Sequence, residues 1–436
     1  MRFNFVILGA LLLFTACEDL DQSPPNLASS NSLTDFEGVL NAAYFYQHGM
    51  ATPFAVMGDF RADNALMIEP PFTEFDMYGP DLTAMEDQFF GPFYTAAYKS
   101  ILSANNVIEN SGDATEVGEA KFLRALAYFK LVRAFGDVPV NLEASPSLTD
   151  PDILVRQPAM DVYNNVIIPD LRDAIGALPA QNRNGRASSI AAQALLGKVF
   201  VQLGDYGSAE PLLAAVINGA GSAGIMLQEN YADIFGTTND GNSEIIYATQ
   251  VSSSITDEYG FSEFWSWYGG LDTKSLMPLD PDLIAAYDAS PGDLRRDVNI
   301  NADLLISPKY PQEGGPDHDW IEIRLADVLL LYAETLLSNG SSIDEAFDVI
   351  DPIRERAGLD ALDADDFDSR DAAFDAIQDE RRLELAFEGQ RWFDLVRTGT
   401  VSEEMGQSIS DDYFLFPIPV SEILASFGVI TQNDGY

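Results

Sequence analysis

The sequence predicts a mostly α-helical fold in which a helical scaffold carries a loop-rich variable lobe between two helical blocks. Apolar residues recur at helical spacing over about 33–218 and again over about 322–398, which is the pattern of helices that bury one face. The segment between them is rich in glycine, proline, aromatic residues and short β-like runs. We therefore expect residues 219–321 to form the lobe, and residues 33–218 and 322–436 to form the two parts of the scaffold, the second with the C-terminal segment.

The chain begins with a pattern typical of a secretory signal peptide. Arg2 supplies a positive charge, residues 3–14 are almost wholly apolar, and two small residues precede Cys17. The apolar run is too short to cross a membrane, which takes roughly 20 apolar residues. We expect residues 1–16 to be removed on export.

Cys17 is the only cysteine in the chain, so no internal disulfide and no two-cysteine metal or redox motif is expected. Its position resembles a bacterial lipobox, although Phe14 stands where that motif usually has leucine. The resemblance implies that Cys17 is lipidated and becomes the new N-terminus. The alternative is ordinary secretion with an unmodified cysteine. Residues 17–32, which contain several proline, serine and asparagine residues, are expected to form an extended tether to the membrane.

The charge balance favours neutral ligands. Loss of residues 1–16 removes only Arg2 among the charged residues, so 23 basic residues face 69 acidic ones and the formal net charge is −46. Such a surface repels nucleic acid and anionic lipid headgroups. A polyanionic glycan would need a local basic pocket to overcome this repulsion.

Two segments of the scaffold have the pattern of a helix, a glycine-containing turn and a second helix. The first spans 190–209, and the second begins at Ala326, with Ala333 and Ala346 in comparable places. Both resemble tetratricopeptide units, in which small residues let paired helices approach closely and stacked units bury a continuous core. The resemblance implies a tetratricopeptide-like α-α superhelix, although Ala-rich helical hairpins also occur in unrelated folds.

A cluster of charged residues precedes the C-terminal segment. Arg381 and Glu384 lie one helical turn apart, as do Arg391 and Asp394, so each pair can form along one helix face. We interpret the cluster as an ion-paired network that fastens the C-terminal segment onto the scaffold. The alternative is a catalytic Glu/Arg cluster.

Aromatic residues in the lobe form the first candidate ligand site. Sugars present flat apolar ring faces edged with hydroxyl groups, so glycan sites combine aromatic platforms with a few hydrogen-bonding side chains. If the segment 261–270 is extended, Trp265 and Trp267 point to the same side, with Tyr268 beside them and Trp320 as a lesser candidate. The alternative is a hydrophobic cluster beneath the loop.

An early Pro-rich loop supplies the second candidate site. It brings polar and aromatic residues together without helical periodicity, and these residues are named from their chemistry and location alone. The candidate ligand-binding residues here are Arg61, Asp63, Asn64, Phe75 and Tyr78.

The sequence contains little that indicates catalysis. Only His48 and His318 are available for acid–base work near neutral pH, and no phosphate-binding glycine loop or Gly-x-Ser-x-Gly elbow is present. The acidic segment 360–368 lacks the glycine and terminal glutamate of a calcium loop. We expect no cofactor, no metal and no enzymatic activity, although a glycosidase pair among so many carboxylates stays open.

Several segments resemble the SusD/RagB family and occur in that family's order, with Glu119–Val140 the closest match. The resemblance implies a lipid-anchored protein on the outer face of the outer membrane that binds a polysaccharide or oligosaccharide and delivers it to a SusC-like TonB-dependent transporter. The alternatives are the same role with a peptide cargo, a surface glycan hydrolase, or a scaffold that binds only proteins. The matching segments are Tyr98–Glu109, Glu119–Val140, Asp161–Leu171, Arg324–Glu334, Asp379–Gly399 and Leu415–Pro419.

Overall fold

The structure is a computed structural model, and it describes residues 36–147, 151–180, 185–252, 263–270, 276–311 and 316–436. The predicted signal peptide, the lipidation site Cys17 and the predicted tether therefore lie outside the described residues. Within the described part of the chain, no helix is both long enough and apolar enough to cross a membrane.

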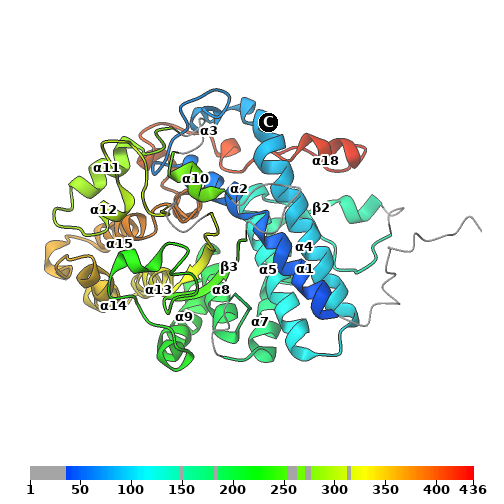
Figure 1. Cartoon of the computed structure of the whole chain (residues 1–436), viewed down its shortest axis with the longest axis horizontal. Coiled ribbons are helices and arrows are strands. Elements are labelled where there is room, and N and C mark those ends of the chain that lie inside the picture. The colour runs from blue at the N-terminus through cyan, green and yellow to red at the C-terminus, as the bar shows by residue number, and fades with distance from the viewer. Residues whose placement is uncertain (1–35, 148–150, 181–184, 253–262, 271–275, 312–315) are drawn as a thin grey trace, which may run out of the picture.

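Long helices packed side by side form the scaffold (Figure 1). The series of contacts runs from α1 through α4, α5, α7, α8 and α9, and then passes to α13, which also contacts α14 and α15. The prediction of a mostly helical, tetratricopeptide-like superhelix is confirmed. The scaffold helices are α1 (Phe36–His48), α4 (Gly91–Asn110), α5 (Ala114–Phe135), α7 (Ile168–Ala177), α8 (Ser189–Gln202), α9 (Tyr206–Ala220), α13 (Leu325–Asn339), α14 (Ile343–Arg356) and α15 (Arg370–Glu384).

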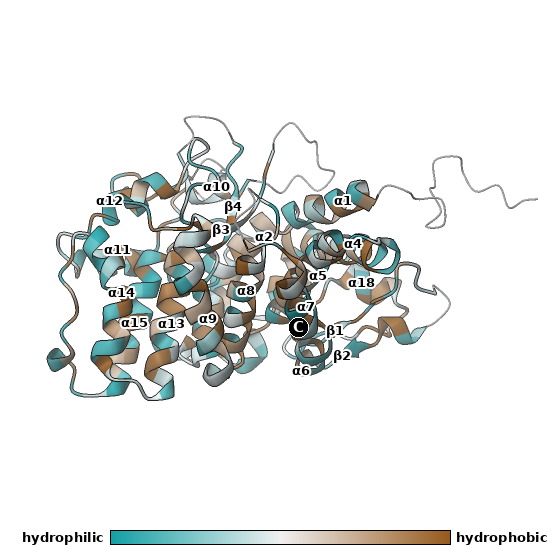
Figure 2. Cartoon of the chain, turned by 90° about the horizontal axis from the view of Figure 1, so that it is seen from below, coloured by the Kyte–Doolittle hydropathy of each residue, from teal (hydrophilic) through white to brown (hydrophobic). Residues whose placement is uncertain are grey.

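Local sequence signals fix where these helices begin and end. The Asp113 side chain accepts hydrogen bonds from the first backbone amides of α5, and Ser342 and Glu345 form a reciprocal capping box at the start of α14. Gly136 ends α5 and Gly340 ends α13, both with positive φ. Apolar and hydrophilic residues share the surfaces of α14 and α15 (Figure 2), as expected for helices that bury one face.

Shorter elements connect and cover the scaffold. Two antiparallel pairs of strands are present, β1 with β2 and β3 with β4. The pair β3–β4 joins the end of the predicted lobe to the start of α13, because β4 leads directly into that helix. The strands are β1 (Val138–Pro139), β2 (Arg156–Gln157), β3 (Ile245–Thr249) and β4 (Trp320–Arg324), and the short α-helices are α2 (Ala51–Ala55), α3 (Glu74–Met77), α6 (Ala159–Val162), α10 (Phe264–Tyr268), α11 (Pro281–Asp288), α12 (Arg296–Asn299), α16 (Arg391–Thr398), α17 (Val401–Glu404) and α18 (Val420–Ala425).

A buried charge network fastens the second half of the scaffold together. Glu384, at the end of α15, accepts hydrogen bonds from Arg295 at 2.9 Å, Arg324 at 2.6 Å and Arg356 at 2.5 Å. Burial alone would raise the pKa of Glu384, but the three guanidinium groups outweigh it and hold that pKa at about 2. The network therefore links β4, α14, α15 and the residue that precedes α12 through one carboxylate.

The pairs expected along single helix faces are wrong, although the expected fastening role agrees with this network. Arg381 contacts Asp327 at 2.8 Å on α13 and Asp394 at 3.1 Å on α16. Arg391 contacts Asp63 at 2.8 Å. These side chains are buried, so they turn toward partners on other elements that can satisfy a desolvated charge, rather than along their own helix.

Candidate functional site

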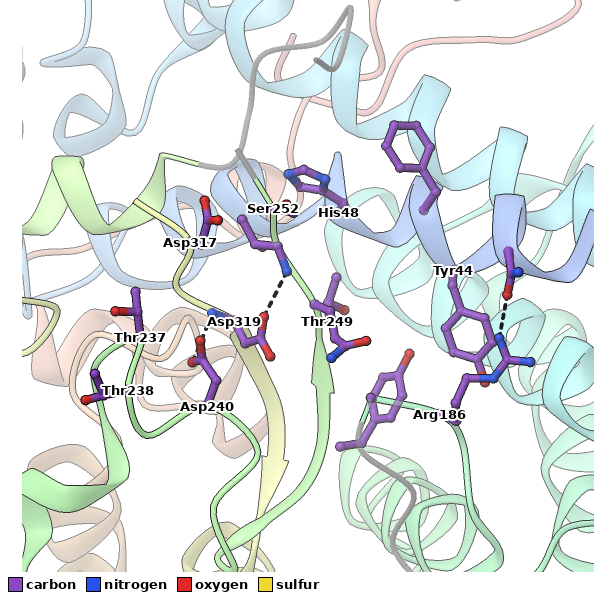
Figure 3. Close-up of a pocket in the computed structure, with 16 residues that line it drawn as sticks. Tyr44, His48, Arg186, Thr237, Thr238, Asp240, Thr249, Ser252, Asp317 and Asp319 are labelled. Carbon is purple, nitrogen blue, oxygen red and sulfur yellow. Dashed lines mark hydrogen bonds between the residues drawn. The ribbon is translucent and has the colours of Figure 1, made fainter. Parts of the chain in front are cut away.

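A cavity of about 790 Å³ lies between α1, the β3–β4 pair and the loop that precedes α8 (Figure 3). Its size is within the range of about 300–1,000 Å³ that is usual for ligand sites. Four separate stretches of the sequence build it. The described residues that line it are Asn41, Tyr44, Phe45, His48, Gly185, Arg186, Thr237, Thr238, Asp240, Tyr247, Thr249, Gln250, Val251, Ser252, Asp317 and Asp319.

The helical wall of the cavity is one face of α1. Asn41, Tyr44, Phe45 and His48 recur at spacings of three and four residues, so they lie on the same side of that helix. The opposite wall includes one face of the strand β3. Side chains alternate between the two faces of a strand, so Tyr247 and Thr249 lie on the same face.

Aromatic side chains line the inner part of the cavity. The Tyr44 hydroxyl donates to Glu119 at 2.6 Å and accepts from the Ala187 amide at 2.9 Å, which fixes the orientation of the ring. Tyr247 is 2% exposed, and its hydroxyl has no hydrogen-bond partner among the described residues. Burial raises the pKa of both tyrosines well above the usual value, so both hydroxyls stay protonated. The Tyr247 hydroxyl is thus a buried donor and acceptor whose hydrogen-bonding capacity is not used among the described residues.

Carboxylates line the opposite side. The Asp319 side chain accepts from the Val251 amide at 2.9 Å, and the Asp319 amide donates to Asp240 at 3.4 Å (Figure 3). Burial raises the pKa of Asp319 to about 7, and repulsion from Asp240 and Asp317 adds to this rise. Near neutral pH the Asp319 side chain is therefore present in both forms, and it can donate or accept a hydrogen bond.

Arg186 is the one cation among the described lining residues. It contacts Glu119 at 2.7 Å and Asn41 at 2.6 Å, and its guanidinium carbon lies 4.6 Å from the centre of the Tyr44 ring. Its charge is thus matched by a buried carboxylate, whose side chain is 2% exposed. The described lining presents hydroxyl, amide and carboxyl groups without a cation that is available to an anionic ligand.

The expected tryptophan platform is not formed as predicted. Residues 264–268 form the short helix α10 and not an extended strand, so Trp265 and Trp267 point in roughly opposite directions. Trp267 is 4% exposed and contacts Phe72 and Phe89. The alternative of a hydrophobic cluster describes this tryptophan better.

Tyr268 and Trp320 also lie in the core. Tyr268 donates its hydroxyl to Asp59 at 2.7 Å, and Trp320 is 1% exposed beneath Phe264. Trp265 is half-buried, and its ring centre lies 6.1 Å from that of His318. His318 stands between Asp317 and Asp319, which line the cavity just before β4. Of the three tryptophans proposed from sequence, only Trp265 lies at the edge of the cavity region.

The polar residues of the early loop are buried and hold the scaffold together. Arg61 donates to the carbonyls of Phe75 and Tyr413 at 2.7 and 3.1 Å, and Asp63 accepts two hydrogen bonds from Arg391 at 2.8 Å. Asn64 donates to Asp59 at 3.0 Å. All three side chains are buried and, apart from the Arg61 Nε, they use their hydrogen-bonding groups inside the protein, so the structure does not place them where a ligand from solution meets them.

The aromatic residues of the same loop are also part of the core. Phe75 packs against Phe89 and Phe90. The Tyr78 hydroxyl donates to the Arg61 carbonyl at 2.8 Å, and the Tyr78 ring lies under the Arg61 guanidinium at 4.4 Å. The contact between the Arg61 guanidinium and the buried Tyr78 ring therefore stabilises the core and does not offer a ring surface to a ligand.

The sequence interpretation missed the actual cavity, because its walls come from segments about 200 residues apart. The signal was present in a weak form. The spacing of Asn41, Tyr44, Phe45 and His48 marks a polar-aromatic helix face, and Tyr247 and Thr249 mark a strand face. Neither face contains the dense aromatic run that drew attention to residues 261–270.

The fold is a helical-repeat scaffold, and its cavity combines aromatic rings with carboxyl groups. Residues 18–201 match the family described as starch-binding and associating with the outer membrane. Residues 305–436 match the SusD family. The chain belongs to the SusD/RagB family. That family consists of carbohydrate-binding, non-catalytic proteins, so the prediction that the chain is not an enzyme is confirmed.

Similar proteins match most or all of the length of the chain. SusD-like protein P2 of Formosa agariphila is 26% identical over an alignment of 513 positions, which covers 100% of this chain and 99% of that protein. A SusD-like protein of Bacteroides ovatus is 26% identical over 90% of this chain and 81% of its own length.

Solved structures show the same fold. A SusD superfamily protein from Parabacteroides distasonis superimposes with a TM-score of 0.77 at 23% identity, over 94% of this chain and 100% of that one. A laminarin-binding SusD-like protein superimposes with a TM-score of 0.74 at 24% identity, over 93% of this chain and 99% of that one.

Proposed function

We propose that this chain is a lipid-anchored protein of the outer cell surface that captures a neutral polysaccharide or oligosaccharide in the cavity between α1 and β3. We further propose that it delivers this cargo to a SusC-like TonB-dependent transporter in the outer membrane. The binding is reversible and non-covalent.

The composition of the cavity supports a carbohydrate cargo. Phe45 and Tyr44 offer ring surface to the apolar face of a sugar. The Tyr247 hydroxyl and the Asp319 carboxyl can hydrogen-bond the sugar hydroxyls at its edges. The observation that carries the proposal is this pairing of rings with unsatisfied or half-protonated polar groups in one cavity of ligand size.

The charges of the described lining support a neutral cargo. Arg186 is neutralised by Glu119 at 2.7 Å, while Asp240, Asp317 and Asp319 line the opposite side. A uronate or sulfate group would meet carboxylates without a matching cation, and repulsion between like charges disfavours that arrangement.

Surface anchoring and hand-over rest on the sequence and on the family. The lipobox-like position of Cys17 supports attachment by acyl chains, and more than one chain is needed for a stable anchor. The family description of association with the outer membrane agrees with this attachment. A protein that binds a glycan without cleaving it can supply that glycan to a transporter, which is why we include delivery in the proposal.

Replacing Tyr247 by Phe tests the proposed site. The substitution removes only the hydroxyl that lacks a partner among the described residues, so the free energy of unfolding should not fall. We expect affinity for a neutral glycan to fall about tenfold, since one buried hydrogen bond to the ligand is worth roughly 1 kcal/mol or slightly more. Calorimetry against a panel of neutral glycans that includes laminarin measures this loss.

Tyr163→Phe is the matched control, because Tyr163 is also a buried tyrosine and lies outside the cavity lining. Its affinity should equal that of the unmodified chain. Glycan affinity that is the same in Tyr247→Phe and the unmodified chain would reject the cavity as the site. Binding of peptides with no binding of any glycan would replace the carbohydrate cargo by a peptide.

A further inference from the structure

Arg133 is a cation that lacks a counter-charge among the described residues. It lies in the last turn of α5 and is partly buried, and its side chain makes no ion pair and no hydrogen bond with them. Burial lowers the pKa of its guanidinium group from 12.5 to about 10, so the group is partly desolvated and still charged at neutral pH. Arg61, which also has no carboxylate partner among the described residues, instead donates to backbone carbonyls at 2.7 and 3.1 Å. Arg133 is therefore a desolvated charge with neither kind of partner.

Three phenylalanine rings surround this guanidinium group without balancing its charge. The guanidinium carbon lies 4.0 Å from the centre of the Phe129 ring and 4.9 Å from the centres of the Phe54 and Phe393 rings. A ring attracts a cation only through its quadrupole, and the C-terminal end of α5 supplies only a partial negative charge. Both favour a cation at this place, but neither removes the cost of a full positive charge that is partly withdrawn from water.

Three carboxylates attract Arg133 through space without forming an ion pair with it, and all three are matched by other cations. Glu322 contacts Lys130. Asp327 and Asp394 belong to a chain of contacts in which three carboxylates alternate with three cations. This chain runs, with 2.5 to 3.1 Å between successive groups, through Lys198, Asp327, Arg381, Asp394, Arg397 and Glu334. Neither set leaves a negative charge for Arg133.

The cluster formed by these two sets and Arg133 is unbalanced by one positive charge, because it contains five cations and four carboxylates. The network around Glu384 is balanced, since it contains five basic and five acidic side chains. A charge withdrawn from water is stable only when it is paired. A single negative charge beside Arg133 would give the first cluster the balance of the second.

From the unpaired guanidinium group, the rings around it and the unbalanced cluster, we infer that Arg133 binds one small monovalent anion, with chloride as its representative. A guanidinium group supplies several N–H donors to such an ion, and the edges of aromatic rings carry a partial positive charge that tolerates it. A divalent anion such as sulfate would bring an excess of negative charge beside four carboxylates. Arg133 is not among the residues that line the cavity between α1 and β3, so this site is separate from the proposed glycan site.

Melting curves of the full chain in sodium chloride and in sodium gluconate test the inference. At equal ionic strength the two salts screen surface charges alike, but gluconate is too large for a site enclosed by three rings. We expect chloride to raise the Tm by about 2–4 °C over gluconate, with saturation, because an ion that binds only the folded state stabilises it. Equal Tm values in the two salts would overturn the inference.

Arg133→Met removes the unmatched charge while keeping a long side chain. We expect this variant to lose the difference between chloride and gluconate, and to melt no lower than the unmodified chain in gluconate, because its cluster is balanced. Lys121→Met is the matched control, since Lys121 lies on the same helix and contacts the exposed Asp173; it should keep the full chloride response. An undiminished chloride response in Arg133→Met contradicts the inferred position of the ion.

A crystal of the unmodified chain soaked in sodium bromide locates the ion by anomalous scattering, so the answer does not depend on the folding of a variant. We expect a bromide within hydrogen-bond distance of the Arg133 guanidinium group. Water alone at that place overturns the inference. A bromide at Arg133 without any chloride dependence of the Tm is an adventitious ion only, and this result overturns the inference as well. Each of these outcomes leaves the proposed glycan site intact, because that site is tested through Tyr247.

Discussion

Replacing Glu384 by Ala is expected to lower the free energy of unfolding by about 3–5 kcal/mol, the usual cost of breaking a buried ion pair from one side. Glu384 is fully buried and accepts hydrogen bonds from Arg295, Arg324 and Arg356. Without its carboxylate, three guanidinium groups that remain desolvated lose a shared counter-charge. Chemical denaturation followed by circular dichroism measures the difference.

The pH dependence of that difference identifies its cause. An unperturbed glutamate has a pKa of 4.5, whereas the pKa of Glu384 in the folded chain is about 2. The folded state therefore favours the charged form. The stabilisation is therefore complete above pH 4.5, and it is lost as the pH falls toward 2. Glu355→Ala is the control, since Glu355 is an exposed residue of α14, and it should change stability by less than about 0.5 kcal/mol. If Glu384→Ala lowered the free energy of unfolding by no more than Glu355→Ala does, the proposed role of the network would be contradicted.

Gly58→Ala is expected to cost about 3 kcal/mol, at the upper end for overpacking a core. A Cβ atom at position 58 would lie 2.2 Å from the Gly389 carbonyl oxygen and 2.5 Å from the Gly389 Cα. The obstacle is backbone, so no side-chain rotation relieves it. The Asp59 carboxylate also accepts from the Gly389 amide at 2.7 Å, and the shift that admits a methyl group would stretch this contact. A thermal melt detects the loss as a lower Tm.

Gly176→Ala is the matched control for the glycine substitution. Gly176 lies within α7, and a Cβ added there would meet no atom within 4 Å. Alanine should stabilise the helix by roughly 0.5–1 kcal/mol. If Gly58→Ala were as stable as the unmodified chain, the close approach of the helical turn at Gly58 to the backbone of Gly389 would be wrong.

The fold could be predicted from the sequence because helical periodicity is a local property. In α5, apolar Phe122, Leu126 and Phe129 recur at spacings of three and four residues, which predicts a helix, and Gly136 ends it, although the helix is buried on most of its surface. The charge pairing could not be predicted from spacing alone. Arg381 and Glu384 are neighbours on α15, yet each is buried against partners on other elements, and that choice depends on tertiary packing.

The candidate site was harder to predict for a related reason. The segment around Trp265 is conspicuous in sequence, but α10 is helical and sends Trp267 into the core. In contrast, Tyr44 and Tyr247 are unremarkable in their own segments and meet only when β3 packs beside α1. A site built from such distant faces has no local sequence signal that distinguishes it from ordinary core.

The most direct test of the central claim is a crystal structure of the chain with a bound neutral oligosaccharide, chosen from the glycan that binds most tightly in calorimetry. We predict a sugar ring against Phe45 and Tyr44, with hydroxyl groups within hydrogen-bond distance of the Tyr247 hydroxyl and the Asp319 carboxyl. An oligosaccharide bound elsewhere on the chain, with water alone between α1 and β3, would contradict the account.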